Sequence, residues 1–384
     1  MIIGLMGFEF NSANKGCEAL SYSFLELINS LETKTSVTIY NFTRYELGLV
    51  PEYFKNFKFE KKNISFKNIS LNYFKNFKDC DVIFDVTMGD SFSDIYSLKL
   101  YRKLIIEKYF AVKLCKKYVS LPQTYGPFYK KSSSFLARVI LKKASLIFCR
   151  DEISKIYLQK EMGIGGGTIL TSDMAFMLSY DKEMYNFNTK TKIGINISGL
   201  LYKGGFHSEN QFGLSLDYKE LIGELLPSLT DKYEVHLIPH VVDLKEDAYD
   251  DDYKICKALH EKYTNTILAP AFDTPIQAKS YISNMDVFIG SRMHSTIASF
   301  SSGVVTIPIS YSRKFEGLFG SLNYPYVVDA KKKSTKSAIE LINNYLDGLK
   351  KLYDTQMESL HIIEMKNKEF GDNIIIILNE IENI

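Results

Sequence analysis

The chain has 384 residues, which is too many for one ordinary hydrophobic core and favours two domains. It is 46% apolar and 24% charged, as globular proteins are, and its net charge of only +2 excludes a general attraction to nucleic acid. The five cysteines show neither a Cys-x-x-Cys pair nor a zinc spacing, no signal peptide is recognisable, and no apolar run is long enough to cross a membrane. We therefore expect a cytoplasmic protein with reduced thiols and no metal site.

Short apolar runs alternate with helical periodicity through the first half of the chain. The predicted strands are Ile2–Leu5, Val37–Asn41, Val82–Val86, Tyr118–Leu121 and Leu146–Cys149. The predicted helices are Glu18–Leu31, Leu98–Lys116, Ser134–Lys143 and Asp151–Glu161. Such alternation is typical of a parallel sheet with helices on both faces.

The same pattern restarts near Lys190. The predicted strands are Ile193–Ile197, Val235–Pro239, Thr266–Ala269, Val287–Ile289, Val304–Ile309 and Val327–Val328. The predicted helices are Tyr218–Leu229, Asp252–Tyr263, Ile276–Asn284 and Ser337–Tyr353. Two such series predict an α/β fold of two Rossmann-like domains, residues 1–185 and 190–356, facing a central cleft. The polar segment Asp181–Lys192 is the predicted linker, and the helical segment 357–384 is expected to pack back on the first domain.

The segment Asp286–Ser310 has the pattern strand, turn, short helix, glycine, strand. Arg292 and His294 fall where the first strand gives way to the helix, and N–H groups at a helix start attract anions. An arginine fork binds carboxylate or phosphate, and a histidine carries protons. If the two strands are neighbours, the ammonium of Lys314 reaches the same pocket. The pattern favours a site for a small dianion, although an isolated Arg-x-His turn more often caps a core helix.

Two further segments each allow two interpretations. Arg150 ends a predicted strand, where it either pairs with Asp151 or Glu152 or clamps an anion. Asn14 and Gly16 open the first helix. Asn14 is either its N-cap or part of a turn that holds a sugar or phosphate, with Gly16 allowing close approach of the backbone.

The loop DVTMGDSFSD, which begins at Asp85, places carboxylates beyond the third strand. It lacks the glycine and the terminal glutamate of an EF-hand loop, so we interpret Asp85 and Asp90 as hydroxyl-binding rather than metal-binding groups. Gln123, beyond the fourth strand, is a candidate for the same task. The run Gly163–Gly167 follows a predicted helix instead of preceding one, which argues against a phosphate loop and indicates a helix end.

Together these pieces resemble the polysaccharide pyruvyl transferase family. The matching stretches, in the family's order, are NKGCEAL, DVTMGDSFSD, LPQTYGPF, FCRDEIS, SDMAF, IGINISG, LIPHV and GSRMHSTIASFSSGVVTIPISYSRKFEG. They cover the chain from Asn14 to about Gly317. The Arg-x-His pair followed by a Tyr-x-x-Lys turn is the most specific of them.

The resemblance implies a fold like that of GT-B glycosyltransferases and transfer of pyruvate from phosphoenolpyruvate onto a sugar as a cyclic ketal. The residues that match the family's donor site are Arg150, Arg292, His294 and Lys314. We expect His294 to be the general acid and the three cations to hold the donor. The residues expected to contact the acceptor are Asn14, Gly16, Asp85, Asp90 and Gln123. One departure is the turn Thr87-Met88-Gly89, where many members carry a glycine-rich triplet, and it puts the acceptor in doubt rather than the donor.

The expected partners are phosphoenolpyruvate and a sugar or lipid-linked oligosaccharide, with no nucleic acid, no metal and no organic cofactor. A lipid-linked acceptor would bring the protein to the inner membrane surface, although no anchor is visible. Two alternatives stay open: a nucleotide-sugar glycosyltransferase, for which Glu316 would grip a ribose, and an inactive glycan-binding relative. The roles of His207 and His240, the acceptor sugar and the oligomeric state are likewise open.

Overall fold

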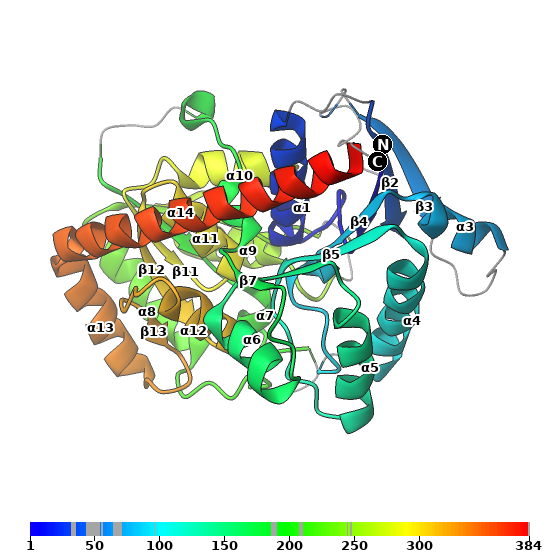
Figure 1. The fold of residues 1–384 in the computed structure, drawn as a ribbon. Coiled ribbons are helices and arrows are strands. Elements are labelled where there is room, and N and C mark those ends of the chain that lie inside the picture. Colours follow the sequence, from blue (N-terminus) through cyan, green and yellow to red (C-terminus); the bar gives the residue numbers. More distant parts are fainter. Residues whose placement is uncertain are drawn as a thin grey trace. The chain divides into compact units, whose positions relative to one another are not determined.

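The computed structural model describes residues 1–31, 36–43, 54, 57–63, 71–95, 97–185, 190–206, 210–243, 245 and 248–382. The chain divides into two compact units (Figure 1). Unit 1 consists of Met1–Ser12, Leu20–Met174 and Glu364–Ile384, and unit 2 of Ala13–Ala19 and Ala175–Ile363. Among the helices formed by the described residues, none combines the length and the apolar composition needed to cross a lipid bilayer.

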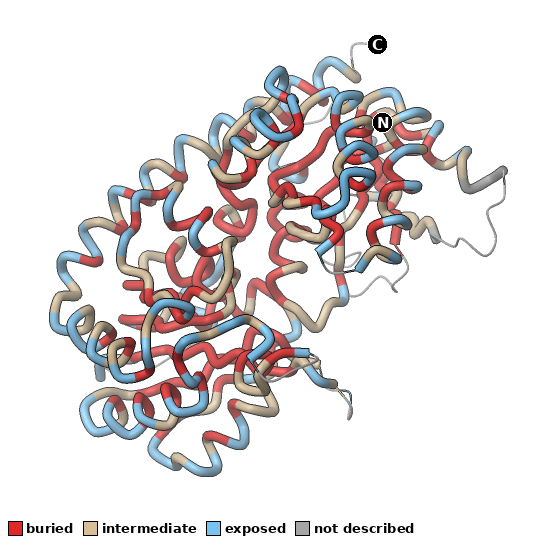
Figure 2. Tube along the Cα trace, turned by 90° about the horizontal axis from the view of Figure 1, so that it is seen from below, coloured by how far each residue is buried: buried red, intermediate tan, exposed pale blue. Residues whose placement is uncertain are grey.

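Unit 1 is built on a seven-stranded parallel sheet with the strand order β3-β2-β1-β4-β5-β6-β7. The strands are β1 (Ile2–Met6), β2 (Thr38–Thr43), β3 (Lys58–Asn63), β4 (Val82–Asp85), β5 (Lys117–Gln123), β6 (Leu146–Cys149) and β7 (Thr168–Leu170). The central strands are buried on both faces, which explains their unbroken apolar sequences. In Figure 2 these strands form the buried interior and the helices carry the exposed faces.

Helices connect the strands of unit 1. They are α1 (Lys15–Ser30), α3 (Leu71–Asp79), the short turn η2 (Thr87–Gly89), α4 (Leu98–Leu114), α5 (Lys131–Leu141) and α6 (Glu152–Ile156), which continues as the π-helical turn η3 (Tyr157–Glu161). Side-chain caps fix two starts: Ser97 Oγ accepts from Leu100 N at α4, and Asp151 accepts from Ser154 N at α6.

The C-terminal helix α14 (Leu349–Glu382) begins in unit 2 and ends in unit 1. In unit 1 the ring of Phe370 packs on Phe148, with 4.8 Å between centroids, and Lys117 forms an ion pair with Glu380. The sequence analysis expected residues 357–384 to return to the first domain, and the structure has residues 364–384 there.

Unit 2 holds a six-stranded parallel sheet with the order β10-β9-β8-β11-β12-β13. Its strands are β8 (Lys192–Asn196), β9 (Glu234–Leu237), β10 (Thr266–Leu268), β11 (Val287–Gly290), β12 (Val305–Ser310) and β13 (Val328–Asp329). Its helices are α7 (Gly199–Tyr202), α8 (Tyr218–Thr230), α9 (Asp252–Lys262), α10 (Pro275–Ile282), α11 (Met293–Ser301), α12 (Arg313–Gly320) and α13 (Thr335–Asp347). The two parallel sheets with their helices confirm the predicted fold class of two Rossmann-like α/β domains.

Three details differ from the sequence analysis. The predicted helix Ser337–Tyr353 is divided between two helices, because Gly348 ends α13 and α14 starts directly after it. The division between the units runs at Met174 and Ala175, ahead of the predicted linker, of which residues 186–189 lie outside the described residues. The short segment Ala13–Ala19 belongs to unit 2 although the sequence around it forms unit 1.

Candidate active site

The start of α11 presents the most specific motif of the chain at the carboxyl end of the unit 2 sheet. Arg292 is the N-cap residue, and its backbone N–H donates to Asn196 Oδ1 at the end of β8 (2.9 Å). The hydroxyl of Ser295 donates to the carbonyl of Arg292 (2.8 Å). Because β8 and β11 are neighbouring strands, this bond fixes where the helix begins and thereby where His294 stands in its first turn.

Two carboxylates surround the guanidinium of Arg292. Its Nε and Nη2 donate to Asp252, at 3.2 and 2.7 Å, and its Nη1 donates to Asp250 at 3.1 Å. Nη2 also pairs with Asp250. Although burial disfavours the charge, Asp252 and Asp250 raise the pKa of Arg292 well above its ordinary value. The arginine is therefore always charged, and its charge is already offset within unit 2.

Asp252 also holds two loops together through three backbone N–H groups. Its carboxylate accepts from the backbone N–H groups of Gly199 (2.8 Å), His240 (3.1 Å) and Val241 (3.0 Å). The residue is fully buried at the start of α9. The loops after β8 and β9 thus converge on one carboxylate, and the sequence analysis did not identify it.

The first turn of α1 completes this cluster. Asn14 forms an antiparallel bridge with Val241, and the N–H of Lys15 donates to the carbonyl of His240 (3.1 Å). Gly16 lies directly against the imidazole of His294, so that a Cβ atom at Gly16 would overlap the ring. The same turn has Asn14 as its cap, since Asn14 Oδ1 accepts from Gly16 N (3.0 Å). Glycine is required here for close approach to His294.

Lys314 and His240 have strongly shifted proton affinities. Lys314 lies in the first turn of α12, and burial lowers its pKa to about 8, with Cys17 acting weakly in the opposite direction. Burial, together with the neighbouring His294, Arg292 and Lys15, lowers the pKa of His240 well below its ordinary value. His240 is therefore a neutral neighbour of the cluster near pH 7, whereas Lys314 can exchange its proton close to that range.

Arg150 lies in unit 1, just beyond the end of β6. Its Nη1 donates to Asp173 (2.9 Å) and its Nε to Thr124 Oγ1 (2.9 Å), while Asp151 Oδ2 stays 4.0 Å away. Among the described residues nothing accepts a hydrogen bond from Nη2, although Arg150 is 97% buried, with 3% of its surface exposed. Asp173, from the SDMAF stretch, is thus the counter-ion in place of the expected Asp151 or Glu152.

Asp85 is the centre of a buried polar network in unit 1. It accepts from Thr87 N (3.1 Å) and Oγ1 (2.8 Å) and contacts Lys108 and Tyr118. Burial lowers the pKa of Lys108 despite Asp85, and burial together with Asp85 raises that of Tyr118. Gln123 is fully buried beside this network and donates to the carbonyl of Asp85 (3.1 Å).

The turn η2 after Asp85 has an unusual backbone. Thr87, Met88 and Gly89 all have positive φ, at 43°, 54° and 84°. Glycine adopts such angles freely, whereas other residues pay about 1–3 kcal/mol each. The turn exposes Asp90 partly at its end. Glycine at position 87 or 88 would remove this cost.

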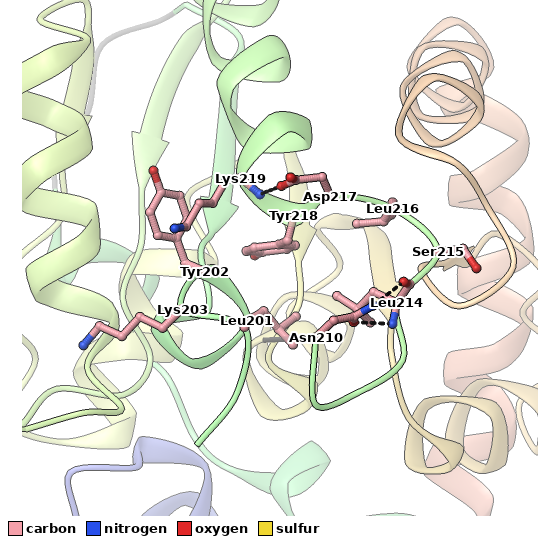
Figure 3. A pocket seen from close by; sticks show the side chains of 11 residues that line it. Leu201, Tyr202, Lys203, Asn210, Leu214, Ser215, Leu216, Asp217, Tyr218 and Lys219 are labelled. Atoms are coloured by element: carbon pink, nitrogen blue, oxygen red, sulfur yellow. Dashed lines mark hydrogen bonds between the residues drawn. The ribbon is translucent and has the colours of Figure 1, made fainter. Parts of the chain in front are cut away.

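A cavity of about 430 Å³ opens in unit 2 between the end of α7 and the start of α8 (Figure 3). Tyr202, Lys203 and Tyr218 are among the residues that line it. The hydroxyl of Tyr218 shares a hydrogen bond of 2.5 Å with Ser291, the residue that precedes Arg292. One wall of this cavity therefore leads to the start of α11.

The predicted site residues fall into two groups. Unit 2 brings together Asn14, Gly16, Arg292, His294 and Lys314, and unit 1 holds Asp85, Asp90, Gln123 and Arg150. Sequence analysis missed Asp173, Asp250, Asp252 and Lys108; the run Asp250–Asp252 ahead of a helix was the available signal for two of them.

His207 lies outside the described residues, and Glu316 is exposed and 3.7 Å from Lys332. Within the described part of the chain, no group of three or more His, Cys, Asp or Glu side chains has a metal-binding arrangement.

Comparison with protein families gives one match over most of the chain: the sequence profile described as polysaccharide pyruvyl transferase matches residues 14–313. No curated protein matches the sequence.

Solved structures with the same fold are distant in sequence. UDP-GlcNAc 2-epimerase from Neisseria meningitidis bound to UDP-GlcNAc has a TM-score of 0.61 and 14% identity, covering 99% of each chain. A putative UDP-N-acetylglucosamine 2-epimerase from Listeria monocytogenes has a TM-score of 0.58 and 13% identity, covering 94% of this chain and 91% of its own. Anabaena Alr3699/HepE in complex with UDP and glucose has a TM-score of 0.58 and 11% identity, covering 97% and 98%. These likenesses establish a GT-B-type fold.

Proposed function

Since the chain belongs to the polysaccharide pyruvyl transferase family, we propose that it transfers the pyruvyl group of phosphoenolpyruvate onto a sugar, forming a cyclic ketal and releasing phosphate. The observation that supports this best is the cluster in unit 2. There, the imidazole of His294 lies against Gly16 in the first turn of α1, and Cys17 of the same turn interacts with Lys314. His294 can carry a proton, and Lys314 can supply positive charge beside the same turn. Both properties suit an anionic substrate that takes up a proton during the reaction.

Phosphoenolpyruvate carries a carboxylate and a phosphate, so its site needs positive charge. We assign Lys314 and the N–H groups at the start of α11 to the donor, because charge-assisted hydrogen bonds to anions are about twice as strong as neutral ones. Arg292 remains a proposed donor ligand, although it would have to exchange Asp250 or Asp252 for the substrate. Arg150, with its Nη2 available, remains proposed from the family pattern.

The reaction needs a general acid. A proton passes from His294 to the CH₂ carbon of the enolpyruvyl group, and an acceptor hydroxyl adds to C2 and loses its proton to the imidazole. The C2–O bond to phosphate then breaks, and a second hydroxyl of the same sugar adds to C2 to close the ketal. The second hydroxyl proton leaves with phosphate, which balances the reaction without an oxidant, a reductant or a cofactor.

The residues proposed for the acceptor are considered within each unit separately. Asp90 is the carboxylate in the η2 loop that is partly exposed, whereas Asp85 and Gln123 are buried and would act by holding the loop in place. Asn14 caps α1 and would act in the same way. The cavity beside Tyr218 is our candidate for a sugar ring, because its lining combines tyrosine and leucine side chains with several polar groups, and a sugar ring presents both C–H faces and hydroxyls.

Thermal unfolding with two candidate donors tests the proposal directly. Phosphoenolpyruvate should raise the midpoint of unfolding, since a ligand at about a hundred times its Kd stabilises by about 2.7 kcal/mol. UDP-glucose should leave the midpoint unchanged, and a phosphate-release assay with a sugar acceptor should report turnover. Stabilisation by UDP-glucose alone would instead identify a nucleotide-sugar glycosyltransferase, and binding without phosphate release in any acceptor mixture would indicate an inactive relative.

A further inference from the structure

Positive charge is concentrated in one part of unit 1. Residues 97–145 contain twelve lysines and arginines and one acidic residue, Glu107, a net charge of +11 in a chain whose total is +2. Glu107 is 96% buried, with 4% of its surface exposed, so it does not reach the surface. Three of these cations do not contribute to the outer surface of the helices: Lys108 is buried against Asp85, and Lys116 and Lys117, at the start of β5, pair with Asp81 and Glu380. The exposed cations on or next to α4 and α5 are Lys99, Arg102, Lys113, Lys130, Lys131, Arg138, Lys142 and Lys143.

The same surface exposes large apolar side chains. Tyr129 and Phe135 are 74% and 63% exposed, and Leu136 follows Phe135 on the outer side of α5. On α4, Ile106 and Tyr109 are exposed between Arg102 and Lys113. Exposed aromatic and aliphatic groups that alternate with lysine and arginine are costly in water unless something covers them.

We call the surface that carries these side chains the α4–α5 face. It consists of the outer sides of α4 and α5 and the loop Tyr129–Lys130 before α5. The two helices pack side by side on the unit 1 sheet (Figure 1). The carboxylate of Asp94, ahead of α4, accepts from the N–H groups of Tyr129 (2.8 Å) and Lys130 (3.0 Å) and so ties the loop to α4. Exposed Ile95 therefore lies next to exposed Tyr129.

We propose that the α4–α5 face docks unit 1 on an anionic lipid bilayer. Cations attract the acidic headgroups, and each lysine or arginine near the surface strengthens membrane binding by about fivefold. Tyr129, Phe135 and Ile106 supply the apolar groups that insert at the headgroup level, as in other interfacial helices. A nucleic acid would use the cations but has no use for this many exposed apolar side chains.

The position of the face gives the docking a purpose. Ile95 and Tyr129 follow the carboxyl ends of β4 and β5, the edge of the sheet where Asp90 and Gln123 lie. A lipid-linked acceptor would then be presented at the edge that is proposed to receive it. This purpose rests on the proposed function, whereas the docking itself is tested without substrate or turnover.

Cosedimentation with vesicles is the test. The full chain should sediment with vesicles of phosphatidylcholine and phosphatidylglycerol in equal parts, and should stay in solution with phosphatidylcholine alone or at high salt. Lys130→Glu/Lys131→Glu should weaken the partition by about tenfold or more. The matched control Lys350→Glu/Lys351→Glu reverses two adjacent exposed lysines on α14 and should leave it unchanged.

The apolar contribution is tested in the same assay. Phe135→Ser should weaken partition roughly tenfold, because a phenylalanine side chain transferred from water contributes about that much. Met365→Ser on α14 is the control, since Met365 is also 63% exposed. Circular dichroism and thermal unfolding establish that each variant is folded.

Three outcomes would overturn the proposal. The first is no binding to anionic vesicles at low salt. The second is weakening by the Lys130/Lys131 variant but not by Phe135→Ser, which would make the face a general polyanion site such as one for nucleic acid. The third is a change in oligomeric mass with Phe135→Ser at unchanged vesicle binding, which would make it a contact between copies of the chain.

Discussion

Each unit carries one arginine just beyond a buried strand, and the two differ in how much of their hydrogen-bonding capacity is used. Arg292 in unit 2 has every guanidinium nitrogen engaged by Asp250 or Asp252. Arg150 in unit 1 has one carboxylate partner, Asp173, and Nη2 makes no hydrogen bond to any residue described by the structure. The two arginines look equivalent in sequence, yet Arg150 has a donor left for an anion and Arg292 does not.

The difference shows that an arginine's position in the fold does not decide what it binds. Asp250 and Asp252, 42 and 40 residues before Arg292, bind its guanidinium, so that Arg292 has a structural role at the start of α11. The adaptable groups of unit 2 are instead His294 and Lys314. We therefore expect changes at these two residues to affect catalysis, and changes at the paired arginines to affect stability as well.

Replacement of His294 should have the largest effect. His294→Ala removes the proposed general acid and should lower the rate of phosphate release from phosphoenolpyruvate by about 10²–10⁴. The variant should still fold, which the midpoint of thermal unfolding checks, so that loss of catalysis is distinguished from loss of structure. A turnover close to that of the unchanged protein would remove His294 from the mechanism and break the contrast between the units.

Removal of Arg150 should mainly cost stability. Arg150→Met leaves Asp173, which is fully buried, without its counter-ion, and the free energy of unfolding should fall by about 3–5 kcal/mol. Denaturant unfolding measures this, with Arg102→Met on the outer side of α4 as an exposed control. The double variant Arg150→Met/Asp173→Asn should recover part of the loss; no recovery would mean that the ion pair is not the cause.

Because Gly16 lies so close to His294, a larger residue at position 16 should lower activity by displacing the imidazole, without removing any catalytic group. Gly16→Ala forces the imidazole to move, and a displacement of about 1 Å can cost 10² in rate. Gly165→Ala is the control, since no atom lies within 4 Å of a Cβ atom placed there. Phosphate release distinguishes them, and equal activity of both variants would show that the contact has no catalytic consequence.

The lowered proton affinity of Lys314 predicts the smallest effect, on the pH dependence. Burial places its pKa at about 8, so the ammonium is present below that pH and lost above it. The kcat/KM for phosphoenolpyruvate should therefore fall above pH 8, by about tenfold if one charge-assisted hydrogen bond is lost. Lys314→Arg keeps its charge and should abolish that fall; a profile identical in both proteins would exclude Lys314 from donor binding.

Most of the fold could be predicted because buried parallel strands are continuous apolar runs. β6 was predicted to the residue, and α1, α4, α5, α8, α9 and α10 lie within three residues of their expected ends. The helices α3 and α12 and the strand β7 were not predicted. β3 was missed because Lys58–Asn63 is a charged edge strand without a run of apolar residues. It is a strand because its backbone pairs with β2.

The candidate site residues were named from the sequence and their roles stay predictions, whereas the partners that the structure gives them were not predicted. The Arg-x-His start of α11 is a local signal, whereas its contact with Gly16 joins residues almost 280 positions apart in the sequence. Likewise, the sequence near Arg150 does not indicate that Asp173 is its partner. Asp151, the neighbouring carboxylate, instead caps the start of α6. Partners of this kind are decided by the tertiary fold.

The turn Thr87-Met88-Gly89 has an evolutionary consequence. Thr87 and Met88 adopt left-handed backbone angles that strain a residue with a side chain. Substitution of either residue by glycine would relieve that strain. Glycine at position 87 would also remove the hydroxyl that donates to Asp85 (2.8 Å), so that relief of backbone strain would be offset by loss of a buried hydrogen bond. The η2 turn is therefore where we expect members of the family to diverge in the glycan they modify.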